Sequence, residues 1–187
     1  MKITVLTILV ASALAVAIGA EARVSGGADP PRLVLWHMVG NAGLGMTETR
    51  IKYSYDQPTH AYTDNGFDYR IYQGRGEIGV AYDRSGHLVW VDTSSPAYRI
   101  PDDFGVGSRI PLGPCHKVKG KCEYRWRFLT LGYGEGGINV WTGATRWAGN
   151  LVNVRIEMRA NRVGRIAMYV NRPRVCYPFY VTCDGIR

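Results

Sequence analysis

The strongest pattern in the chain is an alternation of apolar and polar residues near its C-terminal end. In VNVRIEMR (residues 152–159) four apolar side chains alternate with four polar or charged ones. A period of two is typical of a β-strand with one buried face and one solvated face. The segments GEIGVAYD (76–83), HLVWVD (87–92) and RIAMYV (165–170) are rich in β-branched and aromatic residues, which strands favour. The pattern predicts mostly antiparallel sheet with little helix.

Further segments have strand character. YRIYQG (69–74) and EYRWRFLTLG (123–132) continue the same composition, and RLVLWHMV (32–39) predicts a first apolar strand or a short helix. Neighbouring side chains on a strand point to opposite faces, so the arginines on either side of Trp126 would face away from it. We therefore predict that Trp126 is a core residue. The same prediction is made for Trp36 and Trp90.

Two tight turns are predicted between pairs of these strands. They are DRSG (83–86) and NRVG (161–164). Asp or Asn at the first turn position bonds back to the backbone, and Gly at the fourth accepts a left-handed conformation at little cost. The sequence therefore predicts two β-hairpins.

A short helix is predicted within MTETRIKYSY (46–55). Thr47 is a suitable N-cap, and Glu48 falls in the first turn, where the helix dipole favours an acid. A similar start at Ser108 is soon followed by Pro111. Because proline is tolerated only within the first helical turn, we expect this second helix to be reduced to a single turn.

These features occur twice in the same order. GLGM (43–46) is matched by GVGS (105–108), 62 residues later, and DRSG is matched by NRVG, 78 residues later. The second copy has 16 additional residues between its opening and its last strand pair, where the Gly-rich stretch LGYGEGGINVWTGATRWAGN (131–150) is predicted to be an inserted loop. The sequence therefore predicts an α+β fold, mostly β, of two tandem units, each with a short helix followed by antiparallel strands.

Four regions are expected along the chain. Residues 1–22, MKITVLTILVASALAVAIGAEA, have one basic residue, an uncharged apolar run and small residues at their end, which is the order of a secretory signal peptide. An uncleaved membrane anchor is the alternative, because the apolar run of 18 residues nearly suffices to span a bilayer. A flexible lead-in (23–35), a first repeat unit (36–98) and a second repeat unit (99–187) follow. We expect a secreted protein or one on the extracellular side of the cell envelope.

Four cysteines lie in the second half of the chain, at Cys115, Cys122, Cys176 and Cys183. An even number of cysteines in an exported chain implies disulfides, and four cysteines allow three pairings. The equal spacing within the two neighbouring pairs favours Cys115–Cys122 and Cys176–Cys183. A four-cysteine zinc site is the alternative, and it is disfavoured because ligand pairs in structural zinc sites are usually closer together. No metal or cofactor is expected.

The formal net charge of the chain is +8. This charge permits attraction to phosphates, anionic envelope polymers or an acidic protein. The basic residues are spread along strands and turns rather than clustered, so nucleic acid is not the favoured partner. We expect an extracellular or envelope protein as partner, with membrane contact only if the leader is uncleaved.

GLGMTETR (43–50), FGVGS (104–108) and the two predicted hairpins together resemble the superfamily of β-lactamase-inhibitor proteins. The small lipoprotein of the outer-membrane barrel-assembly machinery carries a single related unit, and uncharacterised secreted proteins of actinobacterial type look similar. The resemblance covers about residues 43–170 and implies a non-enzymatic binding scaffold without naming the ligand. The chain departs from it in the Gly-Ser of the second copy, in the placement of all four cysteines in the second half, and in having no lipobox.

No catalytic motif is complete. The histidines have no HExxH or paired metal-ligand spacing, and no G-x-S-x-G elbow is present. A small secreted nuclease is the alternative function, with general acid–base work shared by His87 and Glu77 or by His116 and Glu123. The plainer interpretation is that these histidines lie on exposed turns. A Cys–His nucleophile at residues 115–116 is disfavoured because the cysteine is expected to be bridged.

The leading functional prediction is a non-catalytic binding protein. Trp, Tyr and Arg on loops commonly supply interface anchors, and the predicted inserted loop holds Tyr133, Trp141, Arg146 and Trp147. We predict that these residues, together with the sheet surface, bind a protein partner. The alternative is that the aromatic residues cover the core under a long loop. A structural envelope protein is the third interpretation.

Overall fold

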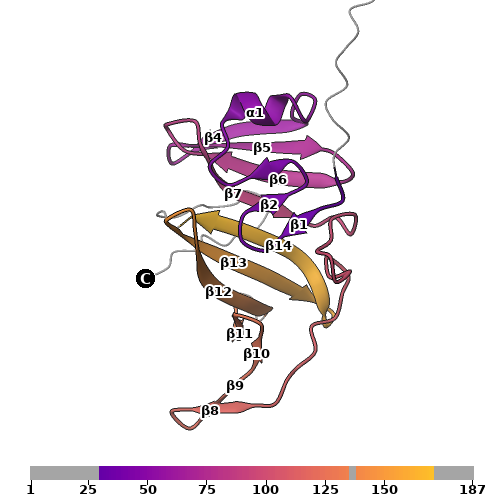
Figure 1. The fold of residues 1–187 in the computed structure, drawn as a ribbon, viewed down its shortest axis with the longest axis vertical. Helices are drawn as coiled ribbons and strands as arrows, with labels where there is room; N and C mark the ends of the chain where they lie inside the picture. Colours follow the sequence, from indigo (N-terminus) through magenta and orange to yellow (C-terminus); the bar gives the residue numbers. More distant parts are fainter. Residues whose placement is uncertain (1–29, 135–137, 171–187) are drawn as a thin grey trace, which may run out of the picture.

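The computed structural model describes residues 30–134 and 138–170. Within these ranges the protein is mostly β, as predicted, and all strand pairs are antiparallel. The largest sheet has nine strands in the order β10-β11-β12-β13-β14-β7-β6-β5-β4 (Figure 1). These strands are β4 (His60–Asp64), β5 (Phe67–Gln73), β6 (Glu77–Tyr82), β7 (Leu88–Thr93), β10 (Arg125–Trp126), β11 (Leu129–Tyr133), β12 (Asn139–Trp147), β13 (Asn150–Arg159) and β14 (Arg162–Val170).

Smaller elements complete the described structure. They are a three-stranded sheet of β1 (Leu33–Val34), β2 (Met38–Val39) and β3 (Ala42–Gly43), the helix α1 (Glu48–Lys52), and a hairpin of β8 (His116–Val118) and β9 (Lys121–Glu123). The predicted helix starting after Thr47 is confirmed, and Thr47 is its N-cap. At five residues, α1 is the single helix of the described ranges. We call α1 and β4–β7 the first half and β10–β14 the second half.

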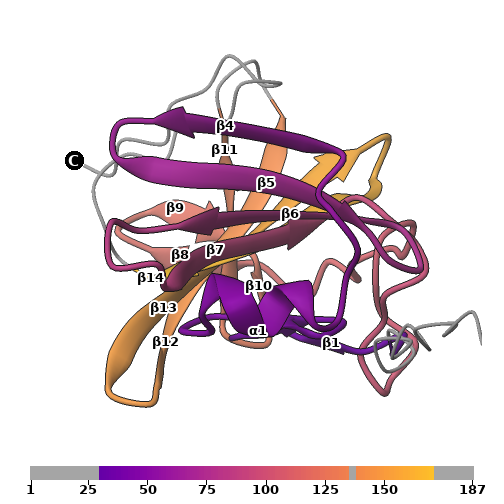
Figure 2. The same ribbon diagram turned by 90° about the horizontal axis from the view of Figure 1, so that it is seen from above.

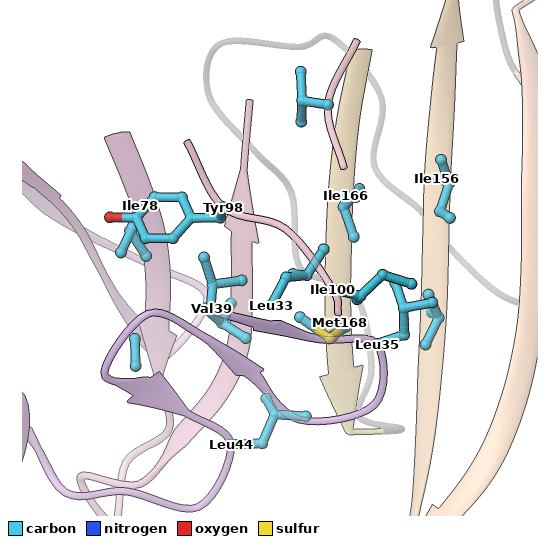
Figure 3. Packing of buried hydrophobic residues seen from close by; sticks show 14 of the residues in the cluster. Leu33, Leu35, Val39, Leu44, Ile78, Tyr98, Ile100, Ile156, Ile166 and Met168 are labelled. Atoms are coloured by element: carbon cyan, nitrogen blue, oxygen red, sulfur yellow. The ribbon is translucent and has the colours of Figure 1, made fainter. Parts of the chain in front are cut away.

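The small sheet and α1 lie on one side of the large sheet, which we call the first face (Figures 1 and 2). The main core fills the space between these layers. Figure 3 shows Leu33 and Leu35 at the small sheet packed near Ile166 and Met168 of β14. Burying one such side chain contributes about 1.5–3 kcal/mol, so this layer stabilises the contact between the two sheets.

The alternation predicted for β13 is confirmed. Its buried residues belong to the main core and are Val152, Val154, Ile156 and Met158. The residues between them point to the opposite side of the sheet, which we call the second face. They are Asn153, Arg155 and Glu157.

The register of the large sheet is symmetric about one residue pair. β7 and β14 are neighbours, and Asp92 of β7 lies opposite Ala167 of β14. The pairs on either side are Val91 with Met168 and Thr93 with Ile166. Each half also has a β-bulge in its last hairpin, between β6 and β7 and between β13 and β14. The strands on the two sides of this pair therefore occupy equivalent positions.

The same backbone hydrogen bonds attach each last hairpin to the segment before it. The N–H of Gly45 donates to the carbonyl of Leu88 (2.7 Å), and the N–H of Leu88 donates to the carbonyl of Met46 (2.8 Å). In the second half, the N–H of Gly107 donates to the carbonyl of Val163 (2.7 Å), and the N–H of Val163 donates to the carbonyl of Ser108 (2.9 Å). Gly45 and Gly107 have φ values of 84° and 89°, in the left-handed region that favours glycine.

One of the two predicted turns is wrong. The turn at residues 83–86 is confirmed by a hydrogen bond of 2.8 Å between its last N–H and its first carbonyl. The turn predicted at 161–164 instead has Ala160 and Asn161 at its centre, with φ values of 48° and 61°. Two successive positive φ values are typical of a type I′ turn, whose twist suits a hairpin. Gly164 lies within β14 at the bulge.

The predicted inserted loop at residues 131–150 is also wrong, because this segment forms most of β11 and β12 and the start of β13. One of its glycines, Gly143, permits close packing of the backbone. At Gly143 of β12, an added Cβ would lie 2.5 Å from the carbonyl oxygen of Phe128 in the β10–β11 turn. A glycine in a strand interior often marks such a close approach of backbone.

Three smaller predictions are corrected. Residues 109–115 have no regular secondary structure, so the expected single helical turn after Ser108 is absent. β1 begins inside the predicted lead-in (23–35), and Leu33 is fully buried, so that lead-in was drawn too long. Trp36 is exposed rather than in the core, whereas Trp90 is buried and Trp126 is half-buried against the main core.

The predicted Cys115–Cys122 bridge is present, with a Cα–Cα distance of 5.3 Å, and it closes the β8–β9 hairpin. Cys176, Cys183 and the predicted leader (1–22) lie outside the described residues. Within the described ranges, no helix has both the length and the apolar character needed to cross a bilayer.

Candidate functional site

A groove of about 450 Å³ lies on the first face of the second half. Trp141 and Met158, both buried, form its floor, and Ile110 and Leu112 of the irregular segment form a wall. Leu112 is 64% exposed. The other lining residues are Arg109, Leu131, Asn139, Ala160 and Asn161. A hollow of this size with an apolar floor and polar groups around it is typical of a binding site. We call it the second-half groove.

In the first half, α1 covers the corresponding part of the sheet. Glu48 of α1 binds Arg70 of β5 at 2.5 Å and Lys52 at 2.7 Å, and Ile51 is fully buried in the main core. β5 and β12 are each separated from the central β7–β14 pair by one strand, β6 or β13. The strand registers then place Trp141 of β12 at the position equivalent to Arg70 of β5. The second half therefore has an apolar ring where the first half has the cation that holds its helix.

The four predicted binding residues do not form one loop. Tyr133 is 85% exposed, whereas Trp141 is 1% exposed. The β11–β12 register puts Tyr133 on the same face as Trp141, at the end of the second-half groove. Arg146 and Trp147 are neighbours on β12, so their side chains point to opposite faces. Of the four, Tyr133 is the one that is both exposed and beside the groove.

Trp147 packs against His37, which lies between β1 and β2. The ring centroids are 4.5 Å apart and the ring planes differ by 6°. Burial, and then the positive charge of Arg32, lower the pKa of His37. A neutral imidazole is thus favoured in this stack. The contact joins the second half to the small sheet, which is a structural use of Trp147.

The second face carries an aromatic cluster. Its buried members are Phe67, Tyr69, Ala81, Val89, Trp90 and Ala167, with Tyr62, Tyr169 and Val170 packed against them. The rings of Tyr62 and Tyr69 stack at 4.7 Å, and those of Trp90 and Tyr169 stack at 4.9 Å. Stacked aromatic pairs of this kind contribute about 0.5–1.5 kcal/mol beyond their burial.

A buried ion pair lies within the aromatic cluster. Nη2 of Arg165 is 2.6 Å from Oδ2 of Asp92. The indole N–H of Trp90 donates to the same oxygen, and the guanidinium lies over the Trp90 ring at 5.8 Å. These partners offset the cost of burying two charges. The sequence patterns did not predict this pair; the signal present was a charged residue in the interior of each of two largely apolar strands.

Two tyrosine hydroxyls of the cluster, those of Tyr62 and Tyr69, are buried without a hydrogen-bond partner among the described residues. Burial, and then the charge of Asp64, raise the pKa of Tyr69 to about 12. Burial also raises the pKa of Tyr62, with Tyr69 adding to the effect. A buried hydroxyl without a partner costs about 1–3 kcal/mol, so both hydroxyls favour an acceptor supplied from outside the sheet.

His87, predicted as an acid–base residue, lines a polar pocket of about 330 Å³ beside Asn150 and Leu151. Oγ of Ser85 is 2.6 Å from Oδ1 of Asp83 and 3.0 Å from Nδ1 of His87. The same carboxylate oxygen accepts the backbone N–H groups of Ser85 and His87. The hydroxyl donates to Asp83 rather than to His87, so the geometry is that of a turn cap and not of a serine activated by histidine.

The two predicted acid–base pairs have different geometry. Glu77 and His87 lie at opposite ends of the β6–β7 hairpin. His116 and Glu123 lie directly opposite each other in the β8–β9 hairpin, where Glu123 binds Arg125 at 3.2 Å. His116 is exposed, and neither residue lines the groove or the polar pocket. The described part of the chain has no group of three or more His, Cys, Asp or Glu side chains suited to a metal ion.

Comparisons with known proteins supply no activity for this chain. No protein-family model matches it, and neither does any curated protein or solved structure. Since a fold alone does not define a function, the functional conclusion depends on the second-half groove and the residues around it.

Proposed function

We propose that the chain is a non-catalytic binding protein of two tandem units, which holds a protein partner in the second-half groove. The symmetric register about Asp92 and Ala167 supports the tandem interpretation, as do the equivalent backbone bonds at Gly45 and Gly107. One observation carries the binding proposal: α1 covers this position in the first half, and in the second half no helix follows Ser108 over the apolar floor. The hollow gains free energy when a partner excludes water from its exposed apolar wall at Leu112.

The proposed occupant is a short amphipathic helix of the partner, in the mode of helix-in-groove recognition. It would insert an apolar side chain against Trp141 and Leu112, as α1 inserts Ile51 into the main core. Arg109 is exposed on the rim and favours an acidic residue next to that side chain. The net charge of +8 would attract an acidic partner over longer distances.

An extracellular or envelope protein is the proposed class of partner. The predicted leader (1–22) supports export, and the Cys115–Cys122 bridge fits an oxidising compartment. The resemblance to the β-lactamase-inhibitor superfamily also implies a scaffold that binds rather than catalyses. Inhibition of a secreted enzyme is one form of this function.

Affinity capture with matched variants tests the groove. The mature protein is immobilised and exposed to culture medium and envelope extract from its source organism. Leu112→Asp places a charge on the groove wall, and Tyr53→Asp places the same charge at the C-cap of α1, where the side chain is 76% exposed. We expect the partner to be retained by the wild type and Tyr53→Asp and lost with Leu112→Asp. Equal retention by both variants, or no partner for the wild type, contradicts the proposal.

A small secreted hydrolase is the second candidate, because His87 lines a polar pocket. If it is correct, hydrolysis of RNA or of an ester substrate should disappear in His87→Ala. In the binding protein, His87→Ala leaves partner capture unchanged. Assays of both properties on this single variant separate the two functions.

A further inference from the structure

The aromatic cluster on the second face is buried more completely than its own layer explains. Tyr69 is 1% exposed and Trp90 is 4% exposed. Among the described residues, every apolar side chain packed in this cluster belongs to β4, β5, β6, β7 or β14. The small sheet and α1 lie on the first face (Figures 1 and 2). Because one face of a sheet buries large side chains only against a second layer, this cluster requires a cover.

We propose that the C-terminal segment, residues 171–187, is this cover. The segment, NRPRVCYPFYVTCDGIR, directly follows Val170, which itself packs against the cluster. Its central part, YPFYV (177–181), has three aromatic rings, a proline and a valine and carries no charge. Burying such a run on an aromatic sheet face removes apolar surface from water on both sides of the contact.

The length of the segment is sufficient. The cluster extends from β14 through β7, β6 and β5 to β4, which are successive neighbours in the sheet. Four strand spacings amount to about 19 Å, and the 17 residues of the segment reach about 56 Å when extended. The chain can therefore cross the whole cluster and still form the predicted Cys176–Cys183 bridge.

The polar groups without a described partner at this face also fit a segment of the chain as the cover. The hydroxyls of Tyr62 and Tyr69 are donors without a described partner. Backbone carbonyls of the covering segment can accept these bonds, and a buried carbonyl itself requires a donor. Both groups are then satisfied by the same contact.

Other chain segments fit this place less well. Residues 1–29 continue into β1 through residues 30–32, and β1 lies on the first face. Residues 135–137 are too few to cover several strands. A second copy of the chain is the remaining candidate, and the experiment distinguishes it from the C-terminal segment.

Photo-crosslinking in the full-length protein tests the inference. The photoreactive residue p-benzoylphenylalanine replaces Phe179, and in a control protein it replaces the exposed Tyr53. We expect irradiation of the Phe179 position to give an internal crosslink to β4, β5 or β7 in a product of monomer mass, and the Tyr53 position to give none to these strands. A crosslinked dimer assigns the face to a second copy, and crosslinks that avoid the second face place the segment elsewhere. Either result overturns the proposal.

A charged variant supplies an independent measurement. Phe179→Asp/Tyr180→Asp makes the segment unsuited to an apolar face, while every sheet residue stays the same. We expect the pKa of Tyr69 to move from about 12 towards its ordinary value of 10, and the tryptophan emission to shift to longer wavelength. Circular dichroism checks that the sheet is retained. An unchanged Tyr69 titration with an intact sheet contradicts the cover.

Discussion

Nη2 of Arg165 lies 2.6 Å from Oδ2 of Asp92, and this ion pair connects the two central strands of the large sheet. Both side chains are buried, and Trp90 donates its indole N–H to the same carboxylate. The pair therefore joins the last strand of the first half to the last strand of the second half. Removing one partner of a buried ion pair lowers stability more than removing both, because the remaining charge stays buried without a counter-charge.

We predict that Arg165→Met lowers the free energy of unfolding by about 3–5 kcal/mol, because it leaves the Asp92 carboxylate buried without its counter-charge. The double variant Asp92→Leu/Arg165→Met should recover part of this loss, since no unpaired charge remains. Urea denaturation followed by circular dichroism gives the three values. A double variant that is less stable than Arg165→Met would contradict the pairing.

Mild acid should weaken the stack of His37 on Trp147. Burial and Arg32 lower the pKa of His37 below its ordinary 6.5, so the unfolded chain binds this proton more tightly. This contribution to stability is complete above pH 6.5 and is lost as the pH falls through the lowered pKa. His37→Gln should reduce the loss of thermal stability between neutral and acidic buffer. The exposed His116→Gln is the control; an equal effect of both variants would speak against the stack.

The Tyr69 hydroxyl of the aromatic cluster should ionise only at high pH. The pKa of Tyr69 is raised from 10 to about 12, so its neutral form stabilises the fold below pH 10 and that contribution is lost as the pH rises towards 12. Ultraviolet difference spectra should show late phenolate signals, of which one, near pH 12, disappears in Tyr69→Phe. Tyr133→Phe, at an exposed position, is the control and should leave the Tyr69 signal unchanged. Early ionisation of Tyr69 in a folded sheet would contradict the burial of this face.

The aromatic residues of the predicted loop should divide into two kinds. Trp141→Ala should lower the free energy of unfolding by about 3–5 kcal/mol because it empties part of the core. Tyr133→Ala should change it by no more than about 0.5 kcal/mol, since the side chain is exposed, yet it should weaken partner capture. Thermal unfolding and capture of the two variants provide the comparison with Tyr53→Ala, an exposed tyrosine away from the groove. If Tyr53→Ala weakens capture as much as Tyr133→Ala, the groove is not the site.

The sequence predicts those parts of the fold in which the burial of a residue is set by its position in its own strand. In β13, each apolar residue faces the main core, so the alternation is visible directly. The turn at 161–164 was misplaced because a glycine suggests a turn locally, whereas Gly164 lies at a bulge. The loop at 131–150 was mispredicted for a similar reason, because Gly143 serves a contact with Phe128 that only the folded chain creates.

The candidate site was less accessible from the sequence. The aromatic residues of one segment looked like a common surface, but tertiary contacts separate their roles: Trp141 forms the floor of the groove and Trp147 stacks on His37. Asp92 and Arg165 are 73 residues apart, and no local pattern connects them. The groove exists because no helix follows Ser108. Pro111 predicted a helix shortened to one turn there, but not its complete absence.

The most direct test of the groove is photo-crosslinking from Leu112. The mature protein carries p-benzoylphenylalanine in place of Leu112, or in place of Tyr53 as the matched exposed control, and is irradiated in culture medium and envelope extract from the source organism. We predict that the Leu112 position forms a crosslink to one exported protein through an apolar, helical segment and that the Tyr53 position does not. Crosslinking to the same protein from both positions, or from Tyr53 alone, would contradict partner binding in the second-half groove.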